Sequence, residues 1–170
     1  MNIVSIHEGG FSDNPNDLGG STNFGISLRF LKLVNEDVNS DGHVDEKDIK
    51  VLSKERALEL YKKYFWDHYG LGGISCDWPA TKALDLFVNM RGRTACKILQ
   101  RSCVVMDLNI AIDGIIGPKT IDAINAAYCF DLEAFKHTVR DHQKQVYTKI
   151  VQKNPSQNEF LKGWLNRARY

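Results

Sequence analysis

The chain has 170 residues, of which 43% are hydrophobic and 25% charged, and its formal net charge is +1. This length supports one sizeable domain or two closely fused lobes, and the balanced charge gives no electrostatic argument for nucleic acid or an anionic membrane surface as a partner. No apolar run approaches the roughly 20 residues needed to span a bilayer, so stable membrane insertion is not expected. The opening MNIVSIHEGG lacks the basic region of a signal peptide, which predicts synthesis in a reducing cytosol.

Helical periodicity recurs along most of the chain, and no segment alternates like a strand. A first helix is predicted over about residues 2–8, followed by a turn-rich connection over residues 11–25. Later helices are expected to begin at residues suited to a cap or a first turn, namely Ser27, Ser53, Pro79 and Pro118. The helix after Ser53 is expected to carry Leu60, Tyr61, Tyr64 and Phe65 on its apolar face, and a later helix is expected to carry Ala95, Ile98, Leu99 and Cys103 on one side. The longest helix is expected over residues 132–153, with an inward stripe of Phe135, Val139, His142, Val146 and Ile150, and a short tail carrying Phe160 and Trp164 follows it. The class is therefore all-α, with predicted lobes over residues 1–77 and 78–170.

The cysteines predict buried thiols and no disulfide. They are Cys76, Cys96, Cys103 and Cys129, and no two form a C-x-x-C pair. Cys96 and Cys103 are seven residues apart in one predicted helix, which separates them by roughly 10.5 Å along its axis. A disulfide needs a Cα separation below about 7 Å, so this pair cannot form one.

An acidic residue ends the first predicted helix. Glu8 stands before two glycines, where the partial negative charge of the helix end raises the pKa of a carboxyl group. A protonated acid of this kind can donate a proton to the leaving oxygen of a glycoside. Asp17 and Thr22 follow in the turn-rich connection, and together the three supply the parts of an inverting glycosidase. The pattern alone also fits two other interpretations, in which Glu8 is a solvated helix end and Asp17 is a plain turn residue.

A stretch of twelve residues, Asp37 to Asp48, fits the pattern of an EF-hand calcium loop. The predicted ligands are Asp37, Asn39, Asp41, His43 through its backbone carbonyl, Asp45 and Asp48. Gly42 stands at the sharp turn. The last position is Asp48 in place of the usual Glu, and its shorter side chain predicts weaker calcium binding with competition from magnesium. A single loop of this kind indicates a structural clip, with a solvated acidic turn as the alternative.

Several segments resemble one known family. EGGF at residues 8–11 and DLGGSTNFGI at residues 17–26 closely resemble the opening signature of glycoside hydrolase family 108, N-acetylmuramidases found largely in phages and prophages. Further similar segments are YFWD at 64–67, LFVN at 86–89, AxxxLQ at 95–100 and DGIIGPKT at 113–120. The last two resemble a lobe described as a predicted peptidoglycan-binding domain.

The resemblance implies a lysozyme-like helical fold of two closely packed lobes. The activity that it implies is hydrolysis of the β-1,4 bond between N-acetylmuramic acid and N-acetylglucosamine. Glu8 matches the family's catalytic glutamate. Asp17 and Thr22 are similar in order to the Glu, Asp, Thr series of other phage lysozymes, although the Asp-to-Thr step is one residue shorter. Asn89 is expected to line the substrate cleft, whereas Asp113 suits a loop-shaping role equally well.

Bacterial peptidoglycan is the partner that the resemblance implies, for a monomer acting as a prophage endolysin. Such a protein is made in the bacterial cytoplasm and reaches the wall after release or export. Three other functions are alternatives: a lytic transglycosylase that needs only the glutamate, a catalytically inactive wall-binding module, and a calcium sensor. The inactive module is disfavoured because Glu8 and its loop are intact, and the sensor because the sequence shows neither a second calcium loop nor an exposed apolar groove clearly. The presence of Asp17 and Thr22 favours hydrolysis over transglycosylation.

Overall fold

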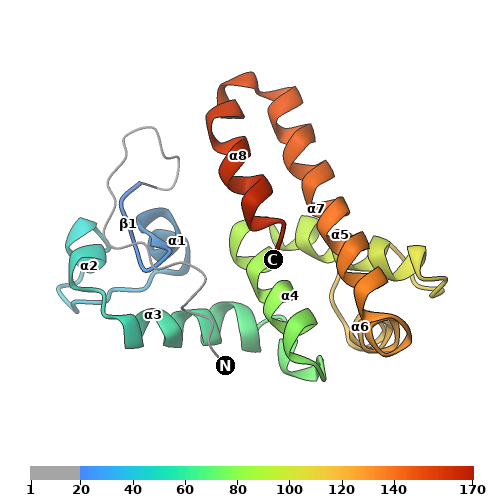
Figure 1. Cartoon of the computed structure of the whole chain (residues 1–170). Coiled ribbons are helices and arrows are strands. Elements are labelled where there is room, and N and C mark those ends of the chain that lie inside the picture. Colours follow the sequence, from blue (N-terminus) through green and yellow to red (C-terminus); the bar gives the residue numbers. More distant parts are fainter. Residues whose placement is uncertain (1–19) are drawn as a thin grey trace. The chain divides into compact units, whose positions relative to one another are not determined.

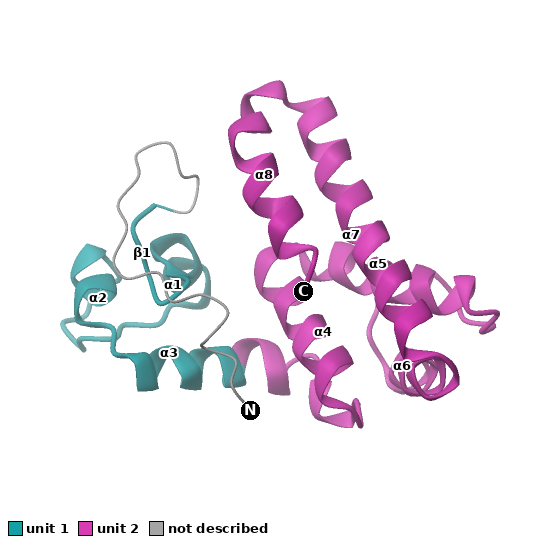
Figure 2. Ribbon diagram, in the orientation of Figure 1, with its two compact units in different colours: residues 1–63 teal, residues 64–170 magenta. Residues whose placement is uncertain are grey.

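The computed structural model describes residues 20–170, and the chain divides into two compact units, residues 1–63 and 64–170 (Figures 1 and 2). The helix predicted near residues 2–8 lies outside the described residues. The lobe boundary predicted at residues 77/78 stays a prediction. None of the helices in residues 20–170 is long and apolar enough to cross a membrane.

The described part of unit 1 is a small hairpin with three short helices. Its elements are β1 (Thr22–Asn23), β2 (Ile26–Ser27), α1 (Leu28–Val34), α2 (Glu46–Val51) and α3 (Lys54–Tyr61). The caps predicted for two helices are confirmed, because Ser27 accepts a hydrogen bond from the Phe30 amide and Ser53 accepts one from the Arg56 amide. Both cap residues have extended backbone, so the helices begin at the expected positions.

The two strands correct the expectation that the chain holds no strand. Each is two residues long, which is too short to show an alternating pattern in the sequence. The core of unit 1 is formed by side chains that are fully or almost fully buried, Ile26, Leu31, Ile49 and Leu60. The hairpin therefore shares one apolar core with all three helices.

Unit 2 is mainly helical. It begins within the π-helix η2 (Lys62–Asp67), and two 3-10 turns follow later, η3 (Leu71–Gly73) and η4 (Pro155–Gln157). Its α-helices are α4 (Asp77–Asn89), α5 (Gly92–Val105), α6 (Pro118–Phe130), α7 (Leu132–Lys153) and α8 (Asn158–Arg167). The bounds of α7 agree with the prediction, and Pro118 occupies the first turn of α6 as expected.

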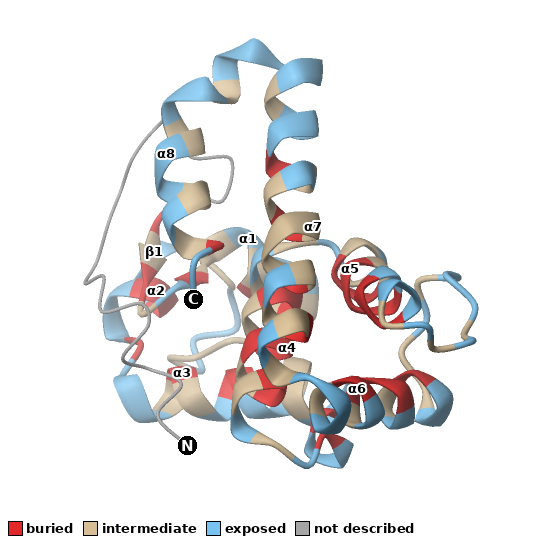
Figure 3. Ribbon diagram, turned by 45° about the vertical axis from the view of Figure 1, so that its right-hand side comes forward, coloured by how far each residue is buried: buried red, intermediate tan, exposed pale blue. Residues whose placement is uncertain are grey.

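Helix α5 is the centre of unit 2, since it packs against α4, α6 and α7. Its buried residues include the predicted Ala95, Ile98, Leu99 and Cys103. Figure 3 shows the buried positions along α5 in red. Each of these three helices buries large apolar side chains, among them Leu84, Ile124 and Phe135, and full burial of one such side chain contributes about 1.5–3 kcal/mol.

The C-terminal region adds two details to the prediction. The short tail predicted after Pro155 contains the helix α8, which packs against α7 (Figure 1). The buried stripe of α7 was expected to pass through Val146 and Ile150, but Gln143 and Tyr147 occupy the inward positions, and Ile150 is 39% exposed. Buried positions advance four residues at a time, so the stripe winds around α7 as its packing partner changes from α5 to α8.

Candidate functional site

The first candidate feature is the hairpin that carries Thr22. Thr22 pairs with Ser27 and Asn23 with Ile26, in antiparallel register. The turn residues Phe24 and Gly25 both have positive φ, 47° and 76°. Turns with positive φ at both central residues match the twist of a tight hairpin. A Cβ on Gly25 would lie 2.4 Å from the hydroxyl oxygen of Tyr61, so the glycine is also required by close packing.

Two side chains hold this hairpin against the helices of unit 1. The Tyr61 hydroxyl donates a 3.0 Å hydrogen bond to the carbonyl oxygen of Phe24. The amide of Asn23 is buried and donates to the carbonyl oxygens of Ile49 and Leu52, at 3.0 and 3.4 Å. Tyr61 is the last residue of α3, and Ile49 and Leu52 lie toward the end of α2. The hairpin is therefore held at its turn by α3 and along β1 by α2.

Thr22 is half-buried at the start of β1, and its hydroxyl donates a 3.3 Å hydrogen bond to the carbonyl oxygen of Gly20. A hydroxyl that donates once keeps lone pairs that accept a hydrogen from water. The neighbouring Ser21 hydroxyl is buried and makes no hydrogen bond within residues 20–170. Glu8 and Asp17, the other two predicted catalytic residues, lie outside the described residues.

The predicted calcium loop is closed by hydrogen bonds from backbone amides to its acidic side chains. Asp37 Oδ2 accepts from the Gly42 amide at 2.8 Å, while Asp37 Oδ1 is buried and has no hydrogen-bond partner in the described chain. Asp41 Oδ1 accepts from the His43 amide at 3.0 Å, which lowers the pKa of Asp41. Gly42 has φ +87°, the conformation expected at the sharp turn.

Asp48 is fully buried and serves the loop differently. Its Oδ1 accepts from the amides of Val38 and Asn39, at 2.7 and 3.1 Å, and its Oδ2 accepts from the Asp45 amide at 2.8 Å. Burial alone would raise the pKa of Asp48, but these amide hydrogen bonds outweigh it and the pKa is lowered. Asp45 and Asp48 form a capping box at the start of α2.

Residues 20–170 contain no group of three or more His, Cys, Asp or Glu side chains already arranged to hold a metal ion. The loop has the composition of a calcium site, and one buried oxygen of Asp37 lacks a hydrogen-bond partner in the part of the chain that the structure describes. Its other carboxylates accept hydrogen bonds from backbone amides.

In unit 2, Asn89 is exposed at the last position of α4. Its amide nitrogen donates to the backbone carbonyl and to the carboxylate of Asp85, at 2.8 and 3.0 Å. Both amide hydrogens are thereby used, and the carbonyl oxygen of the side chain remains as an acceptor. Asn89 lines a groove of about 580 Å³ whose lining residues all belong to unit 2.

Asp113 shapes a loop around the buried side chain of Gln100. The Gln100 amide donates to Asp113 Oδ1 at 2.8 Å and to the Ile115 carbonyl at 3.2 Å, and its oxygen accepts from the Gly114 amide at 2.8 Å. The hydrogen bonds from Gln100 and from the Ile115 amide lower the pKa of Asp113. These hydrogen bonds support the loop-shaping role of Asp113.

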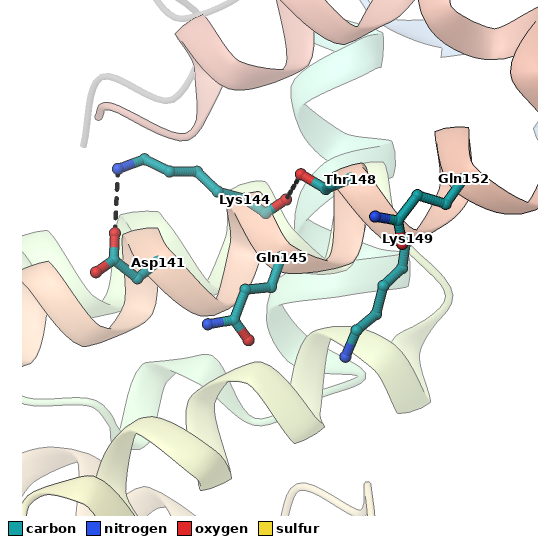
Figure 4. Close-up of a pocket in the computed structure, with 6 residues that line it drawn as sticks. All are labelled: Asp141, Lys144, Gln145, Thr148, Lys149 and Gln152. Carbon is teal, nitrogen blue, oxygen red and sulfur yellow. Dashed lines mark hydrogen bonds and ion pairs between the residues drawn. The ribbon is translucent and has the colours of Figure 1, made fainter.

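A second depression lies along α7 and has no character of a binding site. All six residues that line it come from this one helix (Figure 4). Lys144 forms an ion pair with Asp141 at 3.1 Å, and the Thr148 hydroxyl donates to the Lys144 carbonyl at 2.9 Å. These are the contacts of a solvated helix surface.

Comparison with known proteins assigns both parts of the chain. Residues 1–90 match glycosyl hydrolase 108, and residues 94–169 match a predicted peptidoglycan domain. The solved structure of SagA from Brucella abortus is similar over 98% of this chain and 84% of that chain, with 25% identity and a TM-score of 0.72. No curated protein sequence matches the chain.

The two matches, over a helical fold, define a peptidoglycan-degrading, lysozyme-like hydrolase. The chain belongs to the glycosyl hydrolase 108 family.

Sequence reasoning did not identify Tyr61 as the residue that fixes the hairpin, because it assigned Tyr61 only to the apolar face of a helix. It also missed the groove beside Asn89. Arg91, Tyr147 and Trp164 are brought together there from separate helices. Their separation in the sequence leaves no local signal that would have joined them.

Proposed function

We propose that the protein is an N-acetylmuramidase that hydrolyses the β-1,4 bond between N-acetylmuramic acid and N-acetylglucosamine, with Glu8 as general acid. The observation that carries the proposal is the position of the EGGF and DLGGST segments within the residues that match glycosyl hydrolase 108. The peptidoglycan domain over residues 94–169 supports the same polymer as substrate.

Each proposed catalytic residue has a distinct task. Glu8 donates a proton to the leaving glycosidic oxygen, and Asp17 removes a proton from the attacking water. Thr22 accepts a hydrogen bond from that water. The described contacts support the task of Thr22, because its hairpin is held by Tyr61 and Asn23, and a hydroxyl that positions water must itself be held in place.

Mass spectrometry of the fragments released from purified cell walls tests the proposal. Hydrolysis adds water across the cleaved bond and gives muropeptides that end in a reducing N-acetylmuramic acid. A 1,6-anhydro product would show that the protein is a lytic transglycosylase, and the absence of any released fragment would leave a wall-binding module.

We also propose that residues 37–48 bind Ca²⁺ as a structural clip. Asp37 Oδ1 supports this, because it is buried and has no hydrogen-bond partner among residues 20–170. A buried carboxylate oxygen without a hydrogen bond costs free energy that a cation would recover. Asn39, Asp41, the His43 carbonyl, Asp45 and Asp48 would supply the remaining oxygens. Bound calcium would stabilise the fold and take no part in bond cleavage.

The contacts of Asp48 limit how it can bind the ion. A carboxylate has about four acceptor positions, and three of those on Asp48 receive backbone amides. Only one position remains, so Asp48 would bind calcium through a single oxygen. This supports weaker affinity than a loop with bidentate Glu, and competition by Mg²⁺.

We propose, finally, that the protein acts as a monomer on the bacterial wall, after release or export from the cytoplasm where it is made. An endolysin role in a prophage agrees with the sequence resemblance.

A further inference from the structure

The groove beside Asn89 gathers residues from several helices of unit 2. It measures about 580 Å³. The residues that matter for recognition are Asn89 from α4, Arg91 from the connection to α5, Tyr147 and Lys153 from α7, and Trp164 and Arg167 from α8. Four separate segments therefore form its walls.

One wall is aromatic. The Trp164 ring is half-buried and stacks on Tyr147, with centroids 5.3 Å apart, and on Phe160, with centroids 6.0 Å apart. Tyr147 is itself buried, and its hydroxyl accepts a 3.1 Å hydrogen bond from Gln143. The ring of Trp164 is thus held in position at the groove. A fixed indole offers apolar area to the C–H face of a sugar ring at little entropic cost.

The groove is also positively charged. Three cationic residues line it, Arg91, Lys153 and Arg167, and its described lining includes no acidic side chain. Arg167 pairs with Asp85 at 3.5 Å. Arg91 and Lys153 form no ion pair within residues 20–170. The whole chain has a formal net charge of only +1, so this concentration of charge is local. Arginine and lysine side chains of this kind bind carboxylates through charge-assisted hydrogen bonds.

Asn89 adds a directional acceptor. Because both hydrogens of its amide are donated to Asp85, only its carbonyl oxygen remains to bind a ligand. The N–H of an N-acetyl group is a matching donor. An aromatic wall, an acceptor for an amide N–H and two cations without ion-pair partners together fit a ligand that combines an N-acetylated sugar with a carboxylate.

We propose that this groove binds a muropeptide unit of the wall, with an N-acetylated sugar against Trp164 and Asn89 and a stem-peptide carboxylate against Arg91 and Lys153. This rests on the proposed function for the identity of the polymer. It adds a binding site that holds the substrate through its peptide charge as well as its glycan.

Calorimetry with three probes tests the proposal. They are the disaccharide-tetrapeptide GlcNAc-MurNAc-peptide, uncharged diacetylchitobiose, and the free tetrapeptide. The glycosidic bond of the first runs from GlcNAc to MurNAc and is not the bond of the proposed cleavage, so binding is measured without turnover. The disaccharide-tetrapeptide is expected to bind more tightly than either other probe.

Arg91→Gln and Lys153→Gln are each expected to weaken binding of the disaccharide-tetrapeptide about tenfold, consistent with a lost charge-assisted hydrogen bond, and to leave chitobiose binding unchanged. Arg93→Gln, two residues from Arg91 in the first turn of α5, and Lys149→Gln, one turn from Lys153 on α7, are matched controls outside the groove lining and should change neither. Trp164→Ala should weaken the binding of both the disaccharide-tetrapeptide and chitobiose. Because it also removes packing against Tyr147, Trp164→Phe serves as the milder variant with the same direction of effect.

Equal loss in the control variants, tight binding of the free peptide alone, or no binding of the disaccharide-tetrapeptide would overturn the proposal. Wall digestion separates this from the proposed function. A protein that cleaves walls but does not bind the probe through the groove disproves only the groove. A protein that binds the probe through the groove and releases no fragments disproves only the hydrolase.

Discussion

Tyr61 donates a hydrogen bond to the carbonyl oxygen of Phe24, and the same hydroxyl lies where a Cβ on residue 25 would be only 2.4 Å away. One hydroxyl group at the end of α3 therefore fixes the hairpin and requires glycine in its turn. The hairpin carries Thr22 directly after the DLGGS segment of the family signature.

Replacing Tyr61 by Phe removes this hydrogen bond and should destabilise the protein by about 1 kcal/mol. Gly25→Ala should cost more, because alanine at positive φ is strained and its methyl group meets the hydroxyl. The two effects should not add: Gly25→Ala is expected to cost less in the Tyr61→Phe background than in the wild type. Urea denaturation of the four proteins measures this coupling, and additive costs would show that the close approach does not exist.

Glu8→Gln should abolish wall lysis while the fold is kept. Loss of a general acid typically lowers the rate by about 10²- to 10⁴-fold, and glutamine has the same shape without the proton. Clearing of a turbid wall suspension gives the rate, and circular dichroism reports the fold. Glu55→Gln, at an exposed position of α3, is the matched control. Clearing by Glu8→Gln at a rate near wild type would remove the catalytic assignment.

The loop at residues 37–48 offers two variants that separate ion binding from loop structure. Asp37→Asn keeps an oxygen for the Gly42 amide, so its melting temperature without calcium should equal that of the wild type. The increase in stability on adding calcium, about 2.7 kcal/mol at 100 times the dissociation constant, should disappear.

Asp48→Asn should behave in the opposite way. Both carboxylate oxygens of Asp48 accept from backbone N–H groups, whereas the side-chain amide of asparagine has only one acceptor oxygen. The free energy of unfolding of the variant should therefore fall by about 1.5–3 kcal/mol even in the presence of chelator. Thermal unfolding with calcium, with magnesium and with EDTA measures both variants. A wild-type melting temperature that is the same in all three would show that the loop is only a solvated turn.

The four thiols should react in an order set by burial. Burial raises the pKa of Cys96 and of Cys103 to about 12, with smaller contributions from Asp113 and from Cys96 respectively, whereas Cys129 is exposed. At pH 8 a thiol of that pKa is ionised in roughly one molecule in 10⁴, and the thiolate is the reactive form.

Titration with Ellman's reagent should therefore modify Cys129 first and the half-buried Cys76 next. The remaining two should react only after denaturation. Cys129→Ser should remove the fast phase. Rapid reaction of all four thiols in the native protein would contradict the described burial.

The sequence predicted the helices well where one local signal decides them. Ser27 and Ser53 cap helices because their side chains accept amides three residues on, and this depends on neighbours in the chain. The stripe of α7 was predicted less well, because which face is buried depends on α8, a partner that the sequence does not place. The same reason explains the groove: Arg91 and Trp164 are more than seventy positions apart, and only packing brings them together.

The expected stereochemistry is inversion, with Asp17 as the base. An inverting glycosidase holds its two carboxyl groups roughly 6.5–9.5 Å apart to admit a water, whereas a retaining one holds them about 5–5.5 Å apart. Asp17 follows Glu8 by nine residues in a turn-rich segment and not on the next turn of the same helix, which favours the wider gap. Thr22, on its fixed hairpin, is suited to hold the water between them. Proton NMR during the first minutes of digestion should then show the α-anomer of the new reducing end before mutarotation. Thr22→Val should lower kcat with the anomer unchanged, since it removes only the group that holds the water. Appearance of the β-anomer first would assign retention, and Asp17 would then be a nucleophile or would take no part in the reaction.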